Sequence, residues 1–122
     1  MIIINTVENS LVDLEKKGSL DIAFEVYNPN NYFEKVYHIT YFHEDKKIPT
    51  PDNLEIVCPW YFKFLSDLKK FKFLRLSFYP IVYIMHIIFL CFFIKSKKID
   101  VARGRMPYLM SLSLAIASKI NN

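Results

Sequence analysis

The sequence predicts an α/β domain built on a parallel sheet, and three observations lead to this prediction. Short β-branched runs alternate with segments of helical spacing, which is the order expected of parallel βαβ units. The 122 residues are 52% hydrophobic and 16% aromatic, too rich for a disordered chain and sufficient for a buried core. The length permits one domain or part of one. Together they predict an incomplete Rossmann-like parallel sheet of about four strands with flanking helices.

The first part of the chain predicts one strand followed by short helices. The β-branched run at residues 2–4, ended by polar side chains, predicts a buried first strand over residues 2–7. Between Asn9 and Phe24 the apolar residues follow helical spacing, but Gly18 interrupts them. We therefore expect two short helices, or a helix and a turn, before the asparagine- and proline-rich turn at residues 27–31.

The middle of the chain predicts two more strands around a polar loop. Residues 35–41 alternate, with Val36, His38 and Thr40 on one face, and so predict a second strand. Residues 43–53 are polar and contain two prolines, which favours a loop. A third strand is expected over residues 54–57, because the Cys58-Pro59 pair that follows restricts the backbone.

Helical patterns dominate the second half. Residues 60–75 predict a basic amphipathic helix, and residues 78–94 predict a nearly all-apolar helix that ends at a lysine cluster. Residues 99–102 predict a fourth strand. Pro107 is expected to open a last helix, whose buried stripe is formed by Leu109, Leu112 and Ile116. Since a further strand should follow such a helix, we expect the single domain, residues 1–122, to be truncated.

Charge is unevenly distributed along the chain, whose net charge is +4. Residues 1–34 carry six acids and two bases, whereas residues 63–119 carry eleven bases and two acids. A basic surface beside apolar residues suits an anionic membrane, a phosphate-bearing ligand or nucleic acid. The N-terminus lacks the basic segment, the apolar segment and the small-residue cleavage site of a secretory signal peptide. A cytoplasmic location is therefore expected, at the inner face of the cell membrane if the basic half docks there.

Four local patterns resemble the N-terminal domain of glycosyltransferase family 4 and related GT-B enzymes. These are Ile2-Ile3-Ile4-Asn5, Lys17-Gly18-Ser19 leading to Tyr27-Asn28-Pro29, the segment from Phe33 to Thr40, and the segment from Lys98 through Asp100-Val101-Ala102-Arg103-Gly104-Arg105-Met106-Pro107 to Leu109. The resemblance covers essentially the whole chain. The chain departs from the family at residues 6–10, where it has no glycine-rich turn to approach donor phosphates.

The resemblance implies the acceptor-side half of an enzyme that transfers a sugar from a nucleotide-sugar donor to a lipid-linked or polysaccharide acceptor. The donor would bind a second α/β domain, which this chain lacks, so the chain alone should be inactive. That second domain is expected on the same gene product or as a separately encoded partner. No catalytic residue and no cofactor of its own is predicted for this chain.

The best candidate ligand site is Arg103-Gly104-Arg105, expected just beyond the fourth strand, where open α/β sheets bind ligands. Two guanidiniums could clamp a phosphate or carboxylate, and the alternative is that they are solvated charges. A second candidate is a membrane-surface patch, for which plain core packing is the alternative. It comprises Trp60, Lys63, Lys69, Lys70, Lys72 and Arg75.

Three other interpretations of the sequence concern a metal site, nucleic acid and a membrane span. A metal site at His38, His43 and Glu44 is not expected, because no ligand spacing repeats. Nucleic acid is not an expected partner, because the aromatics of residues 60–75 follow core-like spacing and no RNA-recognition signature accompanies them. The competing function is a small membrane-associated, non-enzymatic protein with one transmembrane helix at residues 78–94, a length near the lower limit for crossing a bilayer.

Overall fold

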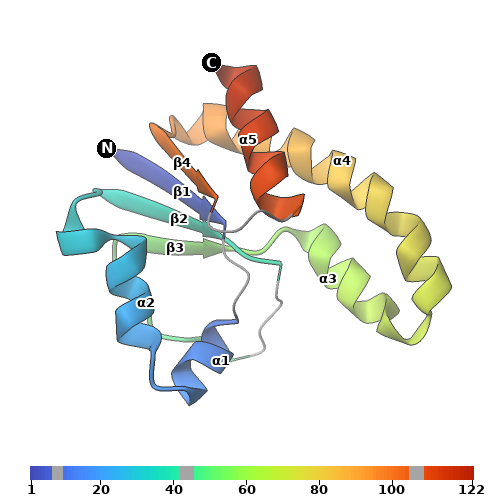
Figure 1. Ribbon diagram of the computed structural model, residues 1–122, viewed down its shortest axis with the longest axis horizontal. Helices are drawn as coiled ribbons and strands as arrows, with labels where there is room; N and C mark the ends of the chain where they lie inside the picture. The colour runs from blue at the N-terminus through green and yellow to red at the C-terminus, as the bar shows by residue number, and fades with distance from the viewer. Residues whose placement is uncertain (7–9, 42–45, 105–108) are drawn as a thin grey trace.

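The computed structural model describes residues 1–6, 10–41, 46–104 and 109–122, and it confirms the α/β prediction. Its centre is a four-stranded, fully parallel sheet with the strand order β3-β2-β1-β4 and helices on both faces (Figure 1). In chain order the elements are β1 (Ile2–Thr6), α1 (Leu11–Lys16), α2 (Leu20–Tyr27), the 3₁₀ helix η1 (Pro29–Asn31), β2 (Lys35–Ile39), β3 (Leu54–Val57), α3 (Trp60–Asp67), the 3₁₀ helix η2 (Leu68–Lys70), α4 (Lys72–Lys97), β4 (Val101–Gly104) and α5 (Leu109–Asn121).

The strand β1 lies between β2 and β4 and is buried from Ile3 to Thr6. Ile3 and Ile4 point to opposite faces of the sheet and are 1% and 0% exposed. Such burial on both sides explains the continuous β-branched run that predicted this strand, because each face of a parallel sheet is covered by helices.

One face of the sheet is covered by α1 and α2. Leu11, Ala23 and Tyr27 pack there against Ile3 and Val36. The predicted break between two short helices is confirmed: Gly18 adopts φ 65°, a left-handed conformation that glycine enters without steric cost. Both faces are covered at β2 as well, so residues 36–40 are all buried rather than alternating between core and solvent.

The opposite face is covered by α5 and the second half of α4. Leu90 and Ile94 of α4 and Leu114 and Ala117 of α5 pack against Ile4 and its neighbours. The prediction that Leu109 and Leu112 belong to the buried stripe of α5 was wrong, because their side chains are 63% and 53% exposed. The small residues Ser113 and Ala117 face inward instead, and they allow α5 to approach β4 and α4 closely.

The fourth strand begins two residues later than predicted. Lys98 ends α4 in the left-handed conformation, and the Ile99 amide donates to the Ile94 carbonyl, which satisfies the end of the helix. The Asp100 carboxylate then accepts the Ile2 amide at 2.7 Å. These contacts occupy residues 98–100, so that β4 covers Val101–Gly104 and not 99–102.

The helices α3 and α4 form a hairpin that extends past the edge of the sheet (Figure 1). The basic helix predicted over residues 60–75 is interrupted, because Phe71 is non-helical and the chain reverses there. The apolar helix predicted over 78–94 starts earlier, at Lys72, and continues through Pro80 to Lys97. Only its second half rests on the sheet, while Val82 and its neighbours pack against Tyr61 and Leu65 of α3.

Replacing Gly104 by alanine should destabilise this fold. A Cβ at Gly104 would lie 2.7 Å from the Ser111 Cβ and 3.2 Å from the Ser111 Cα, so the start of α5 would have to move away from β4. We expect Gly104→Ala to lower the free energy of unfolding by about 1–3 kcal/mol in urea titrations. Gly18→Ala, where nothing lies within 4 Å but φ is positive, is the control and should cost about 1 kcal/mol. A Gly104→Ala protein as stable as the wild type would contradict the close approach of α5.

Candidate functional site

The carboxyl ends of β1 and β4 meet at the point where the strand order reverses. The chain goes from β1 outward through β2 to β3 and then returns to the other side of β1 as β4. In the register of these strands Asn5 lies opposite Arg103, and Thr6 lies opposite Gly104. Open α/β sheets bind ligands at this topological switch point. The fold therefore offers one preferred edge for a ligand.

Polar side chains form a row across the sheet at this edge. Asn5 pairs with Arg103 on one side and His38 on the other. The Asn5 Nδ2 donates to the Tyr27 carbonyl at 3.3 Å, and the Tyr27 ring lies 4.7 Å from the His38 ring between centroids. Arg103 is exposed and donates one guanidinium N–H to the Val26 carbonyl at 3.1 Å. We call Asn5, His38 and Arg103, together with the next residue of β1, Thr6, the polar edge; the Thr6 side chain points to the opposite face of the sheet.

The polar edge contains two buried oxygens without a partner among the residues that the structure describes. The Asn5 Oδ1 and the Thr6 Oγ1 accept and donate no hydrogen bond there, although the residues are only 3% and 2% exposed. A buried polar atom without a partner costs roughly 1–3 kcal/mol. The edge is thus suited to water or to a ligand with hydroxyl or phosphate groups.

The predicted Arg103-Gly104-Arg105 site is only partly described. Arg103 and Gly104 lie inside β4, not beyond its end as predicted, because the strand is shifted by two residues. Gly104 serves packing, since it faces Ser111 of α5. Arg105 lies outside the described residues, so a clamp formed by two guanidiniums stays a prediction. The sequence reasoning missed Asn5 and Thr6, although polar residues that end an apolar strand are the signal for such an edge.

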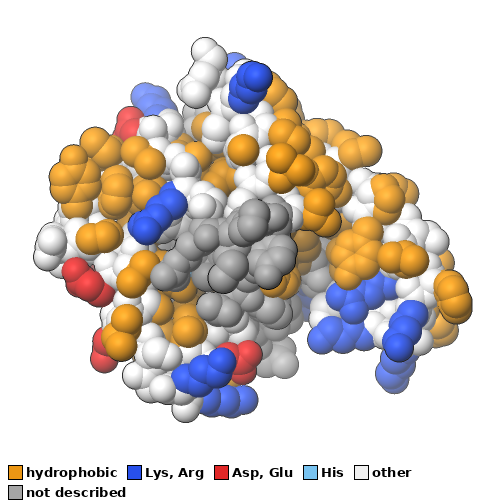
Figure 2. Space-filling view, in the orientation of Figure 1, with side chains coloured by type: hydrophobic (Ala, Val, Ile, Leu, Met, Phe, Trp, Pro, Cys, Tyr) orange, Lys and Arg blue, Asp and Glu red, His pale blue; other side chains and the backbone are white. Residues whose placement is uncertain are grey.

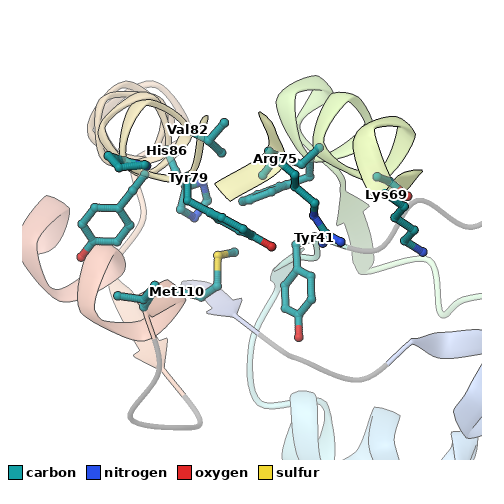
Figure 3. Close-up of a pocket in the computed structure, with 13 residues that line it drawn as sticks. Tyr41, Lys69, Arg75, Tyr79, Val82, His86 and Met110 are labelled. Atoms are coloured by element: carbon teal, nitrogen blue, oxygen red, sulfur yellow. The ribbon is translucent and has the colours of Figure 1, made fainter. Parts of the chain in front are cut away.

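A cleft of about 810 Å³ opens between α3, the first half of α4, the start of α5 and the end of β2 (Figure 3). Its described lining is aromatic and aliphatic, with two cations and no carboxylate. The lining residues are Tyr41, Phe62, Leu65, Ser66, Lys69, Arg75, Tyr79, Pro80, Val82, Tyr83, His86, Leu109 and Met110. This volume and this composition are typical of sites for small organic ligands.

His86 lies on the wall of this cleft and is 1% exposed. Its Nδ1 is 2.6 Å from the Tyr61 hydroxyl of α3. Burial lowers the pKa of His86 to about 4 and raises the pKa of Tyr61, so that both groups are neutral at pH 7. The other histidine in the described residues, His38, is buried in β2, and His43 and Glu44 lie outside them.

The residues of the predicted membrane-surface patch lie on the α3–α4 hairpin. Trp60 is 69% exposed, and Lys63, Lys69, Lys70 and Lys72 are exposed as well. Arg75 differs from them, because it is half-buried and lines the cleft. Figure 2 shows lysine and arginine side chains gathered along one side of the hairpin, with apolar side chains along the helices beside them.

Stability should depend on pH through His86. Because its folded pKa, about 4, lies below the ordinary value of 6.5, the unfolded chain takes up the proton first as the pH falls. The stability is therefore complete above about pH 6.5 and is lost between pH 6.5 and 4. Between pH 7.5 and 4, the loss of unfolding free energy should be about 2–3 kcal/mol smaller for His86→Gln than for the wild type, because each unit of pKa shift corresponds to roughly 1.4 kcal/mol. Urea unfolding of both proteins at pH 7.5, 6, 5 and 4 measures it, and parallel profiles would contradict a neutral buried His86.

The sequence matches no protein-family model, no curated protein and no solved structure. The fold and the polar edge described above are therefore the basis on which a function is proposed.

Proposed function

We propose that this chain is the acceptor-side half of a glycosyltransferase that works at a membrane surface. The observation that carries the proposal is the polar edge, where the buried, unpartnered Asn5 Oδ1 and Arg103 lie on the same face of a parallel sheet at its switch point. The parallel order of the strands agrees with the resemblance stated for the sequence. The acceptor is lipid-linked, and a nucleotide sugar is bound by a second α/β domain, on the same or a separate polypeptide.

Arg103 has a defined role in this proposal. It lies beside Asn5 at the edge that an acceptor hydroxyl and a donor phosphate would approach, and a guanidinium stabilises negative charge on a phosphate. Only one of its N–H groups is known to be engaged, by the Val26 carbonyl. The remaining donors have no partner among the residues that the structure describes, and a ligand could accept from them.

Membrane docking is assigned to the α3–α4 hairpin. The exposed apolar residues of α4 recur at helical spacing along its full length, namely Phe73, Leu76, Ile81, Ile84, Ile88 and Phe92. The helix contains no aspartate or glutamate, and lysines lie at both of its ends. An apolar stripe with basic ends suits a helix that lies in the interface of an anionic membrane.

A single membrane span is the second candidate. α4 is 26 residues long, with a mean hydropathy of 2.1 over its most apolar window, and 22% of that window is buried. Its length of roughly 39 Å exceeds a bilayer core of about 30 Å. However, His86, Leu90 and Ile94 are buried against α3, α5 and the sheet. A helix crossing the bilayer would lose these contacts or take the sheet with it, so peripheral docking is favoured.

Removing positive charge from the hairpin should weaken binding to anionic vesicles. We expect Lys63→Gln, Lys70→Gln and Lys72→Gln together to reduce the partition coefficient on phosphatidylglycerol-containing vesicles roughly a hundredfold, at about 1 kcal/mol for each lysine. The matched control replaces Lys16, Lys17 and Lys47, which are exposed and lie in or after α1 and before β3. Cosedimentation at low and high salt measures both variants.

Three outcomes, two from cosedimentation and one from carbonate washing, contradict peripheral docking. One is equal binding of the two triple variants. Another is binding that does not change between low and high salt, since charge attraction is screened by salt. The third is retention of the wild-type chain in membranes after carbonate washing at high pH, which would support the transmembrane alternative.

Loss of this chain should reduce transfer of sugar to lipid. Membranes of cells lacking the gene are incubated with radiolabelled UDP-, GDP-, ADP- and dTDP-sugars, and label in the solvent-extracted lipid is counted. We expect incorporation from one donor to fall, to be restored by the wild-type gene, and to stay at least tenfold lower with Arg103→Gln. Arg103→Lys, which keeps the charge, should restore part of it.

A structural role of Arg103 is separated by its effect on stability. Loss of the exposed contact with Val26 should cost no more than about 1 kcal/mol of unfolding free energy. Unchanged incorporation from all donors after loss of the gene would overturn the proposed function. If unfolding of Arg103→Gln fully explains the drop in incorporation, Arg103 has no role in the proposed function.

A further inference from the structure

The two cations of the cleft between the α3–α4 hairpin and α5 have no counter-charge among the described residues. Neither Lys69 nor Arg75 forms an ion pair with any residue that the structure describes. No aspartate or glutamate is among the described lining residues. The Arg75 guanidinium lies 5.7 Å from the centroid of the Tyr79 ring, which orients it without neutralising it. The part of the cleft that the structure describes therefore has a positive charge that no described residue neutralises.

Two residues that line the cleft carry buried nitrogens without a partner among the described residues. The Arg75 Nε is buried and has no partner among the described residues, and the same holds for the His86 Nε2. When the Tyr61 hydroxyl donates to the His86 Nδ1, the Nε2 carries the hydrogen and is a second unmet donor. Such groups are matched by a ligand that supplies several acceptor oxygens and negative charge.

The rest of the cleft is apolar and continues into the exposed apolar surface. Val82 and Leu65 form its floor between the two helices of the hairpin, and Leu109 and Met110 enter from α5. Figure 3 shows Arg75, Tyr79 and Tyr41 around one space, with Met110 on the α5 side and Lys69 in η2, which follows α3. Leu109 is 63% exposed, so this wall reaches the surface of the protein.

We infer that the cleft between the α3–α4 hairpin and α5 binds a phosphate ester that carries a hydrocarbon chain, with Arg75 and Lys69 on the phosphate and the chain along Val82, Leu109 and Met110. A free phosphate would leave the apolar walls in water, and a neutral lipid would leave the cations and donors unmatched. Because the exposed Leu109 brings the apolar wall to the protein surface, the ligand has a path into the cleft. The inference deepens the proposed function, and it rests on that function only for taking the ligand to be the sugar acceptor.

Isothermal titration of the purified chain with geranyl phosphate, below its aggregation concentration, tests the site. Geraniol and inorganic phosphate are the comparison ligands. We expect saturable 1:1 binding of geranyl phosphate, at least tenfold weaker binding of geraniol, and no saturable binding of phosphate alone. Binding of geraniol or of inorganic phosphate as tight as that of geranyl phosphate would overturn the inference.

Variants of single lysine and arginine residues locate the binding. Arg75→Gln should weaken geranyl phosphate ten- to hundredfold, as expected for loss of a charge-assisted hydrogen bond. Lys69→Gln, at the exposed end, should weaken it several-fold. Lys47→Gln is the matched control, since Lys47 is exposed, precedes β3 and does not line the cleft, and it should stay within about twofold of wild type. Equal affinity of the Arg75→Gln and wild-type proteins would overturn the inference.

Two measurements keep the test valid if Arg75→Gln unfolds. Arg75→Lys retains the charge but loses the planar fork, and it should show an intermediate loss of affinity. The methyl resonance of Met110 should shift as geranyl phosphate is added to the wild-type chain, and an unshifted resonance at saturation would place the ligand elsewhere.

The failure of this inference is distinguishable from failure of the proposed function. If Arg75→Gln binds geranyl phosphate normally while gene loss abolishes label transfer, only the cleft assignment is wrong. If Arg75→Gln loses binding while gene loss leaves transfer from every donor unchanged, the cleft binds a phosphate lipid and the sugar-transfer proposal is wrong.

Discussion

The pairing of β1 between β2 and β4 is the constraint on which the rest of this structure depends. Ile3 and Ile4 are fully buried because helices cover both faces of the sheet, and neither face could form without this strand. The return of the chain to the open side of β1 also creates the switch point. A single feature of topology thus provides both the core and the edge at which the polar row of Asn5, His38 and Arg103 lies.

The fold class followed from the sequence because its signals are local. The β-branched run at residues 2–4 and the helix break at Gly18 each depend on a few neighbouring side chains. The stripe of α5 was misassigned because periodicity identifies an apolar face without saying what that face meets. Here the close approach of Gly104 to Ser111 decides the orientation, and that contact joins separate elements.

The candidate sites were predictable to different degrees. Arg103 was selected by its position near the end of a strand, but its bond to the Val26 carbonyl requires the packing of α2 beside β4. The cleft was not foreseen, because its lining comes from four separate segments of the chain. Arg75 was interpreted as a surface cation, since the reversal at Phe71 that turns it toward the cleft has no strong signal in residues 60–75.

The contact between Asp100 and Ile2 joins residues 98 positions apart in the sequence. Such long-range pairing is slow to form, because the intervening chain must be ordered first. During synthesis the ribosome completes the apolar helix α4 before it makes β4, so β1 has one unpaired edge until β4 is synthesised. The nascent chain therefore exposes an apolar helix with basic ends before the four-stranded sheet is complete. Early binding to anionic lipid or to a chaperone would protect that helix from aggregation.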